Sequence, residues 1–419
     1  MGVAYLEQAM DYVGEGQDGL KARYLTQIAS ALRAEAQELA RRDDSADSKN
    51  KIKTLSVRAA EASLALSRLD KLDLFRSADA MEAAAGDLNL AGETDRMIEV
   101  LQSYVERFSV EQVESGRARA YLKLARAYQA KAKFRDAIDA YEHVILEFPR
   151  QPEALDSMVP RAACYLRLGG EDAARGEALL IEIVDDRGAE PVFTPSAQEY
   201  RDALVLLGEH YVLPIIDEVG DKDHAAEEAR LVKGVTRLEN TLALYPSDES
   251  VPRLRFFLAE AYRRSSEAIV AGAATVDAGA RREVERRLRR AYENYSFVKD
   301  KFARMDAGEL TALQKTYLRA SYLYLGDCLF DLNETERAVE AYREAAWRYE
   351  NEPAAVAAMM QVVNCYYRMG RAVDAKAALA RMNWLLKKIP DDAFAAVSAM
   401  SPKSYWQDMV TRLERAELN

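Results

Sequence analysis

Three glycines near the N-terminus have the spacing of a phosphate-binding loop. Gly14, Gly16 and Gly19 match the pattern G-x-G-x-x-G. In a dinucleotide-binding fold this loop follows a β-strand and opens a helix, whose N-terminal N–H groups bind the phosphates. The residues before Gly14 instead have helical periodicity, and no stretch of the chain shows sustained two-residue alternation of a strand. The glycines therefore indicate a flexible turn between helices, and we expect no cofactor.

Acid–base and metal chemistry need imidazoles or carboxylates that gather in one place. The histidines His143, His210 and His224 do not cluster, and the chain has no H-E-x-x-H, C-x-x-C or P-loop motif. No pair among the abundant carboxylates stands out as an acid–base dyad. The enzyme alternative for an all-α chain of this length is a helical toroid glycosidase, whose sites stack sugars on aromatic side chains. The chain has few tryptophans: Trp347, Trp384 and Trp406. We therefore expect neither a metal site nor an enzyme.

The three cysteines occupy one recurrent position. Cys164 and Cys365 directly precede a tyrosine, and Cys328 directly precedes a leucine, at the same place in similar helical windows. Other windows have alanine or histidine there, so the position favours a small, half-buried side chain, and cysteine often serves as a small apolar residue. Stacked windows are separated by roughly 10–20 Å, too far for a disulfide or a shared metal. We predict three free, buried and poorly reactive thiols.

One basic cluster stands out in an otherwise acidic chain. Six arginines fall within ten residues: Arg281, Arg282, Arg286, Arg287, Arg289 and Arg290. Glu283 and Glu285 interrupt them, and an apolar stripe from Val284 to Phe302 lies on the same helix, so we expect the arginines to project into solvent. Two interpretations stay open. The cluster is either a solvated face with local ion pairs or a docking face for an acidic partner or lipid headgroups. The docking face would consist of Arg282, Arg286, Arg289 and Arg290.

The composition fits a large helical protein with an acidic surface. The chain has 419 residues, of which only 19 are glycine and 11 proline, so residues that break helices are scarce. Apolar residues make up 49%, enough for an extended core, and the net charge of −11 disfavours binding to a phosphate backbone. No apolar run reaches the roughly 18 residues of a membrane span. The first residues have the pattern of the middle of a helix, and they lack the basic cluster of a secretory signal. We therefore expect the chain to begin inside a longer protein, with Met1 and Gly2 added.

Helical periodicity recurs in a repeating pattern that must position all of these residues. The best window, 118–151, has Leu124, Ala125 and Tyr128 in one helix, then Ala137 and Tyr141 in the next. A second window, from residue 319, repeats this order with glycine in place of one alanine. Its matching residues are Leu325, Gly326, Leu329, Ala338 and Tyr342. Weaker copies align on five further positions: Ala85, Ala162, Gly208, Ala259 and Val363.

This pattern resembles the tetratricopeptide repeat, in which a leucine, a small residue and an aromatic residue mark the first helix, and an alanine and an aromatic residue the second. The resemblance implies an all-α fold, a right-handed α-solenoid superhelix of about seven helix pairs between Leu74 and Pro390. We expect N-terminal helical hairpins over 1–72, the array over 73–400 and a C-terminal capping helix over 401–419. Spacings longer than the family's 34 residues predict insertions at 185–197, 214–228 and 263–283.

Short breaks with characteristic residues separate the predicted helices. Gly92, Gly169 and Gly370 each follow an apolar-periodic run and therefore predict helix ends. Asn333, with Glu336 three residues later, predicts a capping box at the start of the next helix.

Proteins of this family bind partners in a concave groove lined by the first helices, and the resemblance implies such a groove here. One stripe of each first helix is buried, and the stripe about 100° further round is expected to face the groove. It consists of Leu122, Arg126, Gln129, Val205, Glu209, Phe256, Glu260, Arg263, Leu323, Asp327, Phe330, Met360, Asn364 and Tyr367. Its apolar anchors and charges of both signs suit a peptide or helix laid along the groove. Alternatively, Phe256 and Phe330 pack on insertions that fill the groove.

We predict a non-enzymatic scaffold that binds a protein or peptide but no nucleic acid, and we leave its oligomeric state open. Second helices that end in Phe148-Pro149 and Tyr245-Pro246 resemble those of bacterial cell-envelope repeat proteins, including outer-membrane assembly lipoproteins. This implies a bacterial protein of the cytoplasm or the periplasmic side of the envelope, with the envelope favoured. Two alternatives stay open: a structural subunit of an envelope complex that uses convex faces and insertions, and a peptide-sensing regulatory segment of a larger protein.

Overall fold

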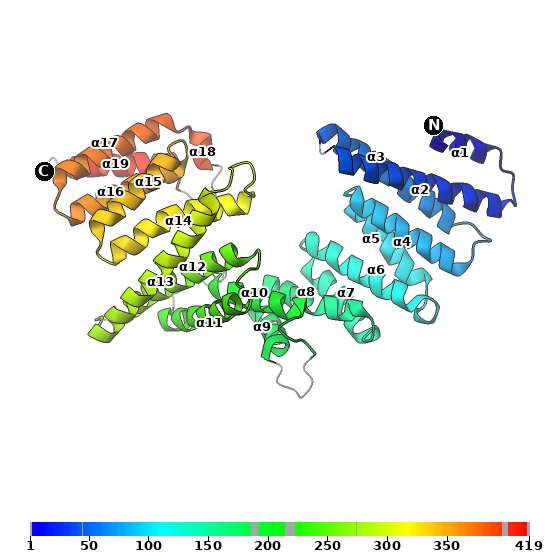
Figure 1. Ribbon diagram of the computed structural model, residues 1–419, viewed down its shortest axis with the longest axis horizontal. Helices are drawn as coiled ribbons and strands as arrows, with labels where there is room; N and C mark the ends of the chain where they lie inside the picture. The colour runs from blue at the N-terminus through cyan, green and yellow to red at the C-terminus, as the bar shows by residue number, and fades with distance from the viewer. Residues whose placement is uncertain are drawn as a thin grey trace. The chain divides into compact units, whose positions relative to one another are not determined.

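The chain folds entirely into helices where its structure is described. The computed structural model describes residues 2–43, 45–185, 192–213, 223–273, 275–395 and 401–416. Every regular element in these ranges is a helix, which confirms the all-α prediction. The chain divides into two compact units, unit 1 (Met1–Phe193) and unit 2 (Thr194–Asn419). Within each unit, helices that follow one another in sequence stack side by side as in an α-solenoid (Figure 1).

Unit 1 starts with three helices outside the repeat pattern and continues with three repeat pairs. Its helices are α1 (Gly2–Asp11), α2 (Asp18–Arg42), α3 (Ala46–Ser67), α4 (Leu74–Leu90), α5 (Thr94–Arg107), α6 (Val110–Ala130), α7 (Phe134–Glu147), α8 (Pro152–Leu168) and α9 (Gly170–Asp185). Each helix packs against the next, and α6 also contacts α4 and α8, the first helices of the neighbouring pairs. The segments predicted as N-terminal hairpins form α2 and α3, which bury Leu32 and Ala59 in a common cluster.

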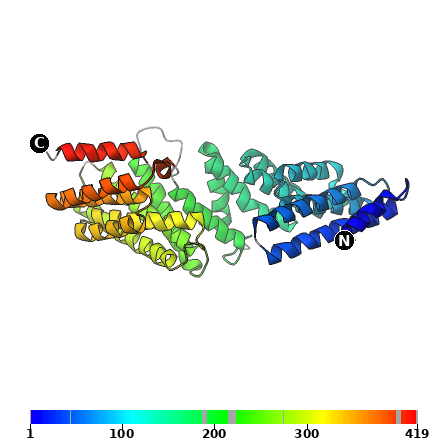
Figure 2. The ribbon, with the colours of Figure 1, turned by 90° about the horizontal axis from the view of Figure 1, so that it is seen from above.

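Unit 2 contains four repeat pairs and two further helices. They are α10 (Gln198–Val212), α11 (His224–Leu244), α12 (Val251–Gly272), α13 (Ala278–Ala303), α14 (Ala312–Asp331), α15 (Thr335–Arg348), α16 (Pro353–Arg368), α17 (Ala372–Lys388), α18 (Asp391–Ala395) and α19 (Lys403–Ala416). The first helices α10, α12, α14 and α16 contact one another in that order. At the C-terminal end α19 packs on α17 and buries Val410, the place expected of a capping helix (Figure 2).

The seven helix pairs follow the repeat pattern read from the sequence. The residues on which the seven windows align are all buried in the first helices: Ala85, Ala125, Ala162, Gly208, Ala259, Gly326 and Val363. A Cβ on Gly208 would lie 2.6 Å from Leu238 Cδ2, and one on Gly326 would clash with the Tyr342 ring. A larger residue would therefore require the Leu238 side chain or the Tyr342 ring to shift, because the paired helices approach closely at these two crossings.

A second-helix tyrosine fills the space beside the small residue in four of the pairs. The four largest fully buried side chains of the described residues all occupy this position: Tyr104, Tyr141, Tyr295 and Tyr342. Each lies four residues after a buried alanine or valine of its helix, the spacing of neighbours on one helical face. Leucine takes the same position in the other three pairs, at Leu180, Leu238 and Leu379. The tyrosine hydroxyls extend beyond the leucine side chain and contact residues of the first helices.

The predicted insertions take different forms. Most of 263–283 is helical, because α12 continues to Gly272 and α13 begins at Ala278, so the extra residues lengthen the pair. In 214–228, α11 begins at His224, while 214–222 lie outside the described residues. Residues 186–191 also lie outside them, Asp185 ends α9, and 192–197 belong to the connection between α9 and α10. The boundaries at 72 and 400 and the right-handed superhelix stay predictions.

The helix-ending glycines are confirmed, and the predicted capping box is wrong. Gly92, Gly169 and Gly370 have positive φ angles of 73°, 79° and 70°, which glycine adopts without strain. Asn333 has a φ angle of 61° and follows α14, while α15 begins only at Thr335. Asn333 thus takes the place of a helix-ending glycine, because asparagine tolerates the left-handed region better than most residues.

Candidate protein-binding surface

The predicted groove residues of unit 2 lie on four first helices that pack in sequence. Most of them are half-buried: Val205, Glu260, Arg263, Leu323, Asp327, Phe330, Met360 and Asn364. Glu209 and Phe256 are buried, whereas Tyr367 is 39% exposed. The apolar members Val205, Leu323, Phe330 and Met360 also pack against the hydrophobic core of the unit. The predicted stripe is therefore a surface continuous with the core, with side chains partly fixed by it.

Phe256 belongs to the core of unit 2. It is 8% exposed, and its ring centroid lies 4.5 Å from that of Tyr317 on α14 and 5.8 Å from that of Tyr295 on α13. These contacts join three helices of successive pairs rather than an insertion. Such aromatic packing stabilises the stacking of the repeats, and it leaves Phe256 little surface for a partner.

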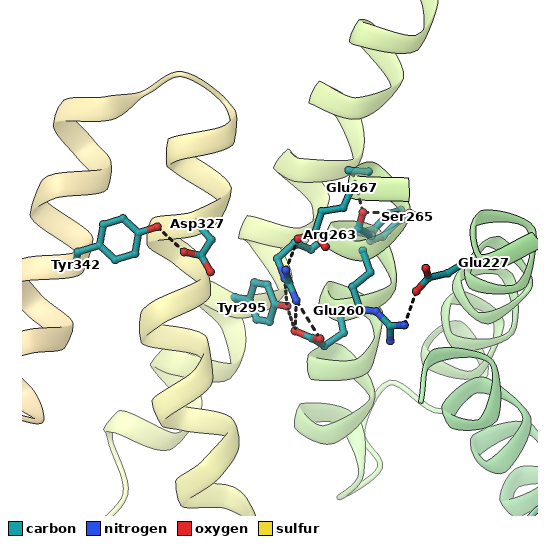
Figure 3. Close-up of polar contacts among 11 residues, drawn as sticks. Glu227, Glu260, Arg263, Ser265, Glu267, Tyr295, Asp327 and Tyr342 are labelled. Atoms are coloured by element: carbon teal, nitrogen blue, oxygen red, sulfur yellow. Dashed lines mark hydrogen bonds and ion pairs between the residues drawn. The ribbon is translucent and has the colours of Figure 1, made fainter. Parts of the chain in front are cut away.

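Glu260 and Arg263, on α12, are held together by the buried Tyr295 of α13 (Figure 3). The Tyr295 hydroxyl donates to Glu260 Oε1, and Arg263 Nη2 lies 3.3 Å from Glu260 Oε2. Arg263 Nε is 3.4 Å from the same hydroxyl, and Nη1 of Arg263 pairs with Glu267 one turn further along. The guanidinium also lies 4.5 Å from the ring centroid of Tyr324 on α14. One arginine thus faces two carboxylates at a fixed place between α12 and α14.

Asp327 is placed in the same way by the next pair of helices. The hydroxyl of Tyr342, on α15, donates to Asp327 Oδ1 on α14 (Figure 3). Burial raises the pKa of Asp327, while the Tyr342 hydrogen bond and the Arg263 charge act in the opposite direction. Burial also raises the pKa of Tyr295 well above its ordinary value, and the Glu260 charge adds to this effect. Burial and the Asp327 charge raise the pKa of Tyr342 as well, so both tyrosines stay protonated and act as hydrogen-bond donors to carboxylates.

Polar contacts between helices also hold the residues at the two ends of the stripe. Glu209 of α10 pairs with Arg253 of α12 at 2.5 Å. At the other end the Arg368 guanidinium lies 4.3 Å from the centroid of the Phe330 ring, and its Nη1 donates to the Phe330 carbonyl at 2.9 Å. Asn364 donates to Gln361 Oε1 at 2.9 Å within α16. Cross-helix contacts therefore connect α10 with α12, α12 with α14, and α14 with α16.

The unit 1 members of the predicted stripe lie on α6. Leu122 is buried, whereas Arg126 is exposed and lies 3.7 Å from Asp156 of α8. Gln129 accepts a hydrogen bond of 2.7 Å from the hydroxyl of Tyr141 on α7. Tyr141 and Tyr342 hold the same position in their repeats, so the same buried hydroxyl binds a neutral amide in unit 1 and a carboxylate in unit 2.

The arginine cluster of α13 is paired with carboxylates of the chain. Arg286 binds Glu283 at 2.7 Å, and Arg289 binds Glu285 at 2.9 Å. Arg290 lies 3.4 Å from Glu293. Such local pairs are those of a solvated face, and the docking interpretation, which also includes Arg282, stays a prediction.

One arginine of the cluster does not project into solvent as expected. Arg287 is buried, with its Nη2 2.8 Å from Glu228 of α11 and its Nε 2.7 Å from Glu283. The prediction is wrong for Arg287 because α12 extends to Gly272, and Arg287 Nη1 lies 3.4 Å from the carbonyl of Ser265 on that helix.

The three cysteines lie in the interior of the protein. Cys164, Cys328 and Cys365 are free and buried, as predicted. Burial raises the pKa of the Cys164 and Cys365 thiols to about 11, and that of Cys328 further.

Gly14 and Gly16 lie in the connection between α1 and α2, so the G-x-G-x-x-G segment follows a helix. In the described ranges no histidine, cysteine and carboxylate groups gather as a metal site, and no helix is long and apolar enough to cross a bilayer.

Two segments match the sequence model of the tetratricopeptide repeat family, residues 119–150 in unit 1 and 320–351 in unit 2. The chain therefore contains tetratricopeptide repeats. The matched segments contain α7 with Tyr141 and α15 with Tyr342. None of the curated proteins compared with this repeat protein matches its sequence.

The chain is similar to several solved structures, with low sequence identity and TM-scores below 0.5. A tetratricopeptide repeat protein from Parabacteroides merdae is 12% identical, with 80% of this chain and 99% of that chain covered and a TM-score of 0.41. A signal transduction ATPase with a tetratricopeptide repeat sensor from Pyrococcus horikoshii is 12% identical, with 91% and 51% covered and a TM-score of 0.39. The TPR2AB domain of yeast Sti1 in a pHSP90 complex is 13% identical, with 84% and 99% covered and a TM-score of 0.25. The family assignment rests on the two matched segments.

Sequence reasoning missed the part that Tyr295 plays in this repeat protein. The signal was present, because Ala291 and Tyr295 have the spacing of Ala137 and Tyr141 in the better-matched repeat. The weak first helix of the Tyr295 repeat hid the correspondence. Its acceptor, Glu260, could be placed on the stripe from the sequence, but the hydrogen bond between them depends on the close approach of α12 and α13.

Proposed function

We propose that the first-helix surface of unit 2 binds an extended segment or a helix of a partner protein. Tetratricopeptide repeats make the chain a protein-interaction scaffold. The surface on α10, α12, α14 and α16 supports the finer proposal, because it combines half-buried apolar side chains with charges of both signs. No catalytic step is part of the proposed function.

The observation that carries the proposal is that tyrosines of the second helices hold the polar side chains of the first-helix surface in place. Tyr295 and Tyr342 reach from the second helices and hold Glu260 and Asp327 by hydrogen bonds. Arg263 is held by Glu260 and stacks on Tyr324. Groups that are already ordered lose little conformational entropy when a partner binds, so each contact contributes more to affinity. The same contacts also join the repeats, and an experiment must separate the two roles.

Site-specific photo-crosslinking tests where a partner lies. We expect p-benzoylphenylalanine at Tyr367, an exposed aromatic position on α16, to form crosslinks with a partner protein in a lysate of the source cells. The same residue at Glu293, which is exposed on α13, is the matched control on a second helix. Crosslinks from Glu293 but none from Tyr367 would place the partner on the other layer of helices and contradict the proposal.

A substitution on the same surface separates binding from folding. Phe330→Ala removes a half-buried ring that packs under Arg368 without belonging to the fully buried core. We expect crosslinking at Tyr367 to fall about tenfold, the effect of losing one aromatic anchor, with a small change in melting temperature. Unchanged crosslinking with a lowered melting temperature would give Phe330 a structural role only.

A further inference from the structure

A pocket of about 400 Å³ opens between α15, α16 and α17, away from the first-helix stripe. Its lining residues are Arg343, Ala346, Trp347, Met359, Tyr366, Asp374, Ala377, Ala378, Arg381 and Leu385. Most of them belong to the second helices α15 and α17, and two come from α16. This volume falls within the roughly 300–1,000 Å³ of typical ligand pockets.

The floor of the pocket is apolar and its edge is aromatic. Met359, Tyr366 and Leu385 are buried, so they form a fixed floor. Trp347 lines the pocket although it is 76% exposed, and Trp384 of α17 is 44% exposed nearby, with the Arg381 guanidinium 4.0 Å from its ring centroid. Exposed tryptophans beside an apolar hollow are typical of surfaces that bind another molecule.

Cations exceed carboxylates around this pocket. Arg343 forms no ion pair or hydrogen bond with any residue of the described ranges. Asp374 is already bound by Arg371 at 2.7 Å. Glu350 is the shared partner of Arg381, at 3.3 Å, and of Lys388, at 2.7 Å. The rim therefore has an excess of positive charge, in a chain whose net charge is −11.

We propose that this pocket receives a large apolar side chain from an acidic segment of a partner protein. The apolar floor and Trp347 bind the side chain, and the arginines attract the flanking carboxylates. Arg343 is free to form a new ion pair, and a guanidinium binds a carboxylate through two parallel hydrogen bonds. The site lies mainly on second helices, and none of its lining residues belongs to the predicted groove on the first helices.

Synthetic peptides test the chemistry with the full chain. The probe is a fluorescein-labelled peptide with one central tryptophan between two runs of glutamates, and its binding is measured by fluorescence anisotropy. We expect saturable binding that weakens about tenfold when alanine replaces the tryptophan, since one hot-spot side chain is worth more than about 1 kcal/mol. Binding should also weaken as salt is added. Equal binding of a peptide with lysines in place of the glutamates would overturn the proposal.

Charge reversals locate the binding on the protein. The double variant Arg343→Glu with Arg381→Glu should lower the affinity for the glutamate peptide at least about tenfold, because two attractive charges become repulsive. The matched control, Arg337→Glu with Lys387→Glu, changes the same charge on the same helices at positions that do not line the pocket. We expect its affinity to stay within about twofold. Equal losses in the two variants would show general surface charge and overturn the assignment to the pocket.

A variant in the pocket and a size measurement complete the test. Trp347→Ala should abolish peptide binding without a change in melting temperature, because the side chain is largely exposed. Unchanged binding would contradict the proposal. Sedimentation velocity should give the same mass for wild type and Trp347→Ala. A wild-type dimer that Trp347→Ala dissociates would make a second copy of this acidic chain the occupant and overturn the proposed partner.

Discussion

The two units place the same buried tyrosine against different partners. In unit 1 the Tyr141 hydroxyl donates to Gln129, a neutral amide, at 2.7 Å. In unit 2 the corresponding hydroxyls of Tyr295 and Tyr342 donate to carboxylates, those of Glu260 and Asp327. The repeat keeps the tyrosine and the small residue beside it, while the residue that accepts the hydrogen bond varies in charge and lies one turn further along the first helix in unit 1.

The difference separates what holds the repeat together from what its surface presents. A neutral acceptor supplies the hydrogen bond at little desolvation cost, so Gln129 suffices for packing. A buried carboxylate costs free energy unless it is paired, and burial indeed raises the pKa of Asp327. Unit 2 offsets part of that cost with Tyr342 and with Arg263, whose charge opposes the shift. The result is a first-helix surface with fixed charges, which unit 1 lacks at Gln129.

The largest expected effect comes from the small residue next to the tyrosine. Gly326→Ala adds a Cβ that meets the Tyr342 ring, so the ring must move away from Asp327. We expect the free energy of unfolding to fall by about 3 kcal/mol, the upper part of the usual range for overpacking. Denaturant unfolding followed by circular dichroism measures it.

Unit 1 supplies the matched control for this substitution. Ala125 already has a Cβ at the corresponding place and is fully buried. Ala125→Gly should therefore cost only about 1 kcal/mol, the difference in helix propensity. Equal effects at the two sites would show that the Tyr342 contact does not constrain the α14–α15 pair.

Removal of the tyrosine hydroxyl is expected to have a smaller effect that differs between the units. Tyr342→Phe leaves the Asp327 carboxylate buried without this donor, and we expect a loss of about 2 kcal/mol. Tyr141→Phe should cost about 1 kcal/mol, because the half-buried Gln129 amide finds a water partner. Thermal and denaturant unfolding of the two variants compares them directly.

A second change tests whether the charge causes the difference between these variants. Adding Asp327→Asn to Tyr342→Phe should recover about half of the loss, because the side chain left without a donor is then neutral. No recovery would mean that the hydroxyl acts through packing alone, and the contrast between the units would not be electrostatic.

Much of the fold could be predicted from the sequence, because the repeat is defined by spacings between residues that are close together in the sequence. Small residues such as Ala125 and Gly326, and aromatics such as Tyr141, recur at fixed distances, and helical periodicity connects them. The segment 263–283 was harder: it has no strong helix consensus, and its residues became extra turns of α12 and α13. The capping box predicted at Asn333 was wrong because asparagine both caps helices and adopts positive φ angles.

The candidate site could be predicted only in part. The stripe with Glu260, Arg263 and Asp327 follows from helical geometry, but the partners that fix these residues come from neighbouring helices. Phe256 shows the limit: its position on the stripe indicated an anchor, yet Tyr317 from the next pair covers it. Contacts between helices that are distant in the sequence decide which side chains are buried. The periodicity within one helix carries no information about these contacts.

The smallest expected effect is a change in the pH dependence of stability. The pKa of Asp327 is raised above its ordinary value of 3.8 in the folded protein, with burial as the main cause. The folded state therefore binds more protons than the unfolded state in that range, so this group lowers stability as the pH rises through its folded pKa. Asp327→Asn removes the effect, and its amide oxygen still accepts from Tyr342. We expect the variant to be about 1 kcal/mol more stable than wild type near pH 7.5, with the gain shrinking towards pH 4.

The reverse change, from an amide to a carboxylate, can be made in unit 1. Gln129→Glu places a carboxylate opposite Tyr141 and should lower stability near pH 7.5 by less than about 1 kcal/mol, because the side chain is half-buried and Arg126 lies one turn away on α6. Melting temperatures at intervals from pH 4 to pH 8 measure both variants against wild type. Glu260, Arg263 and Glu267 are common to wild type and Asp327→Asn. Burial raises the pKa of Asp331, one turn further along α14, to about 6, and the Asp327 charge adds to this effect, so the difference curve reports Asp327 together with this coupled carboxyl. A gain that is independent of pH would assign the effect to packing, and the contrast between an amide in unit 1 and a carboxylate in unit 2 would then have no electrostatic consequence.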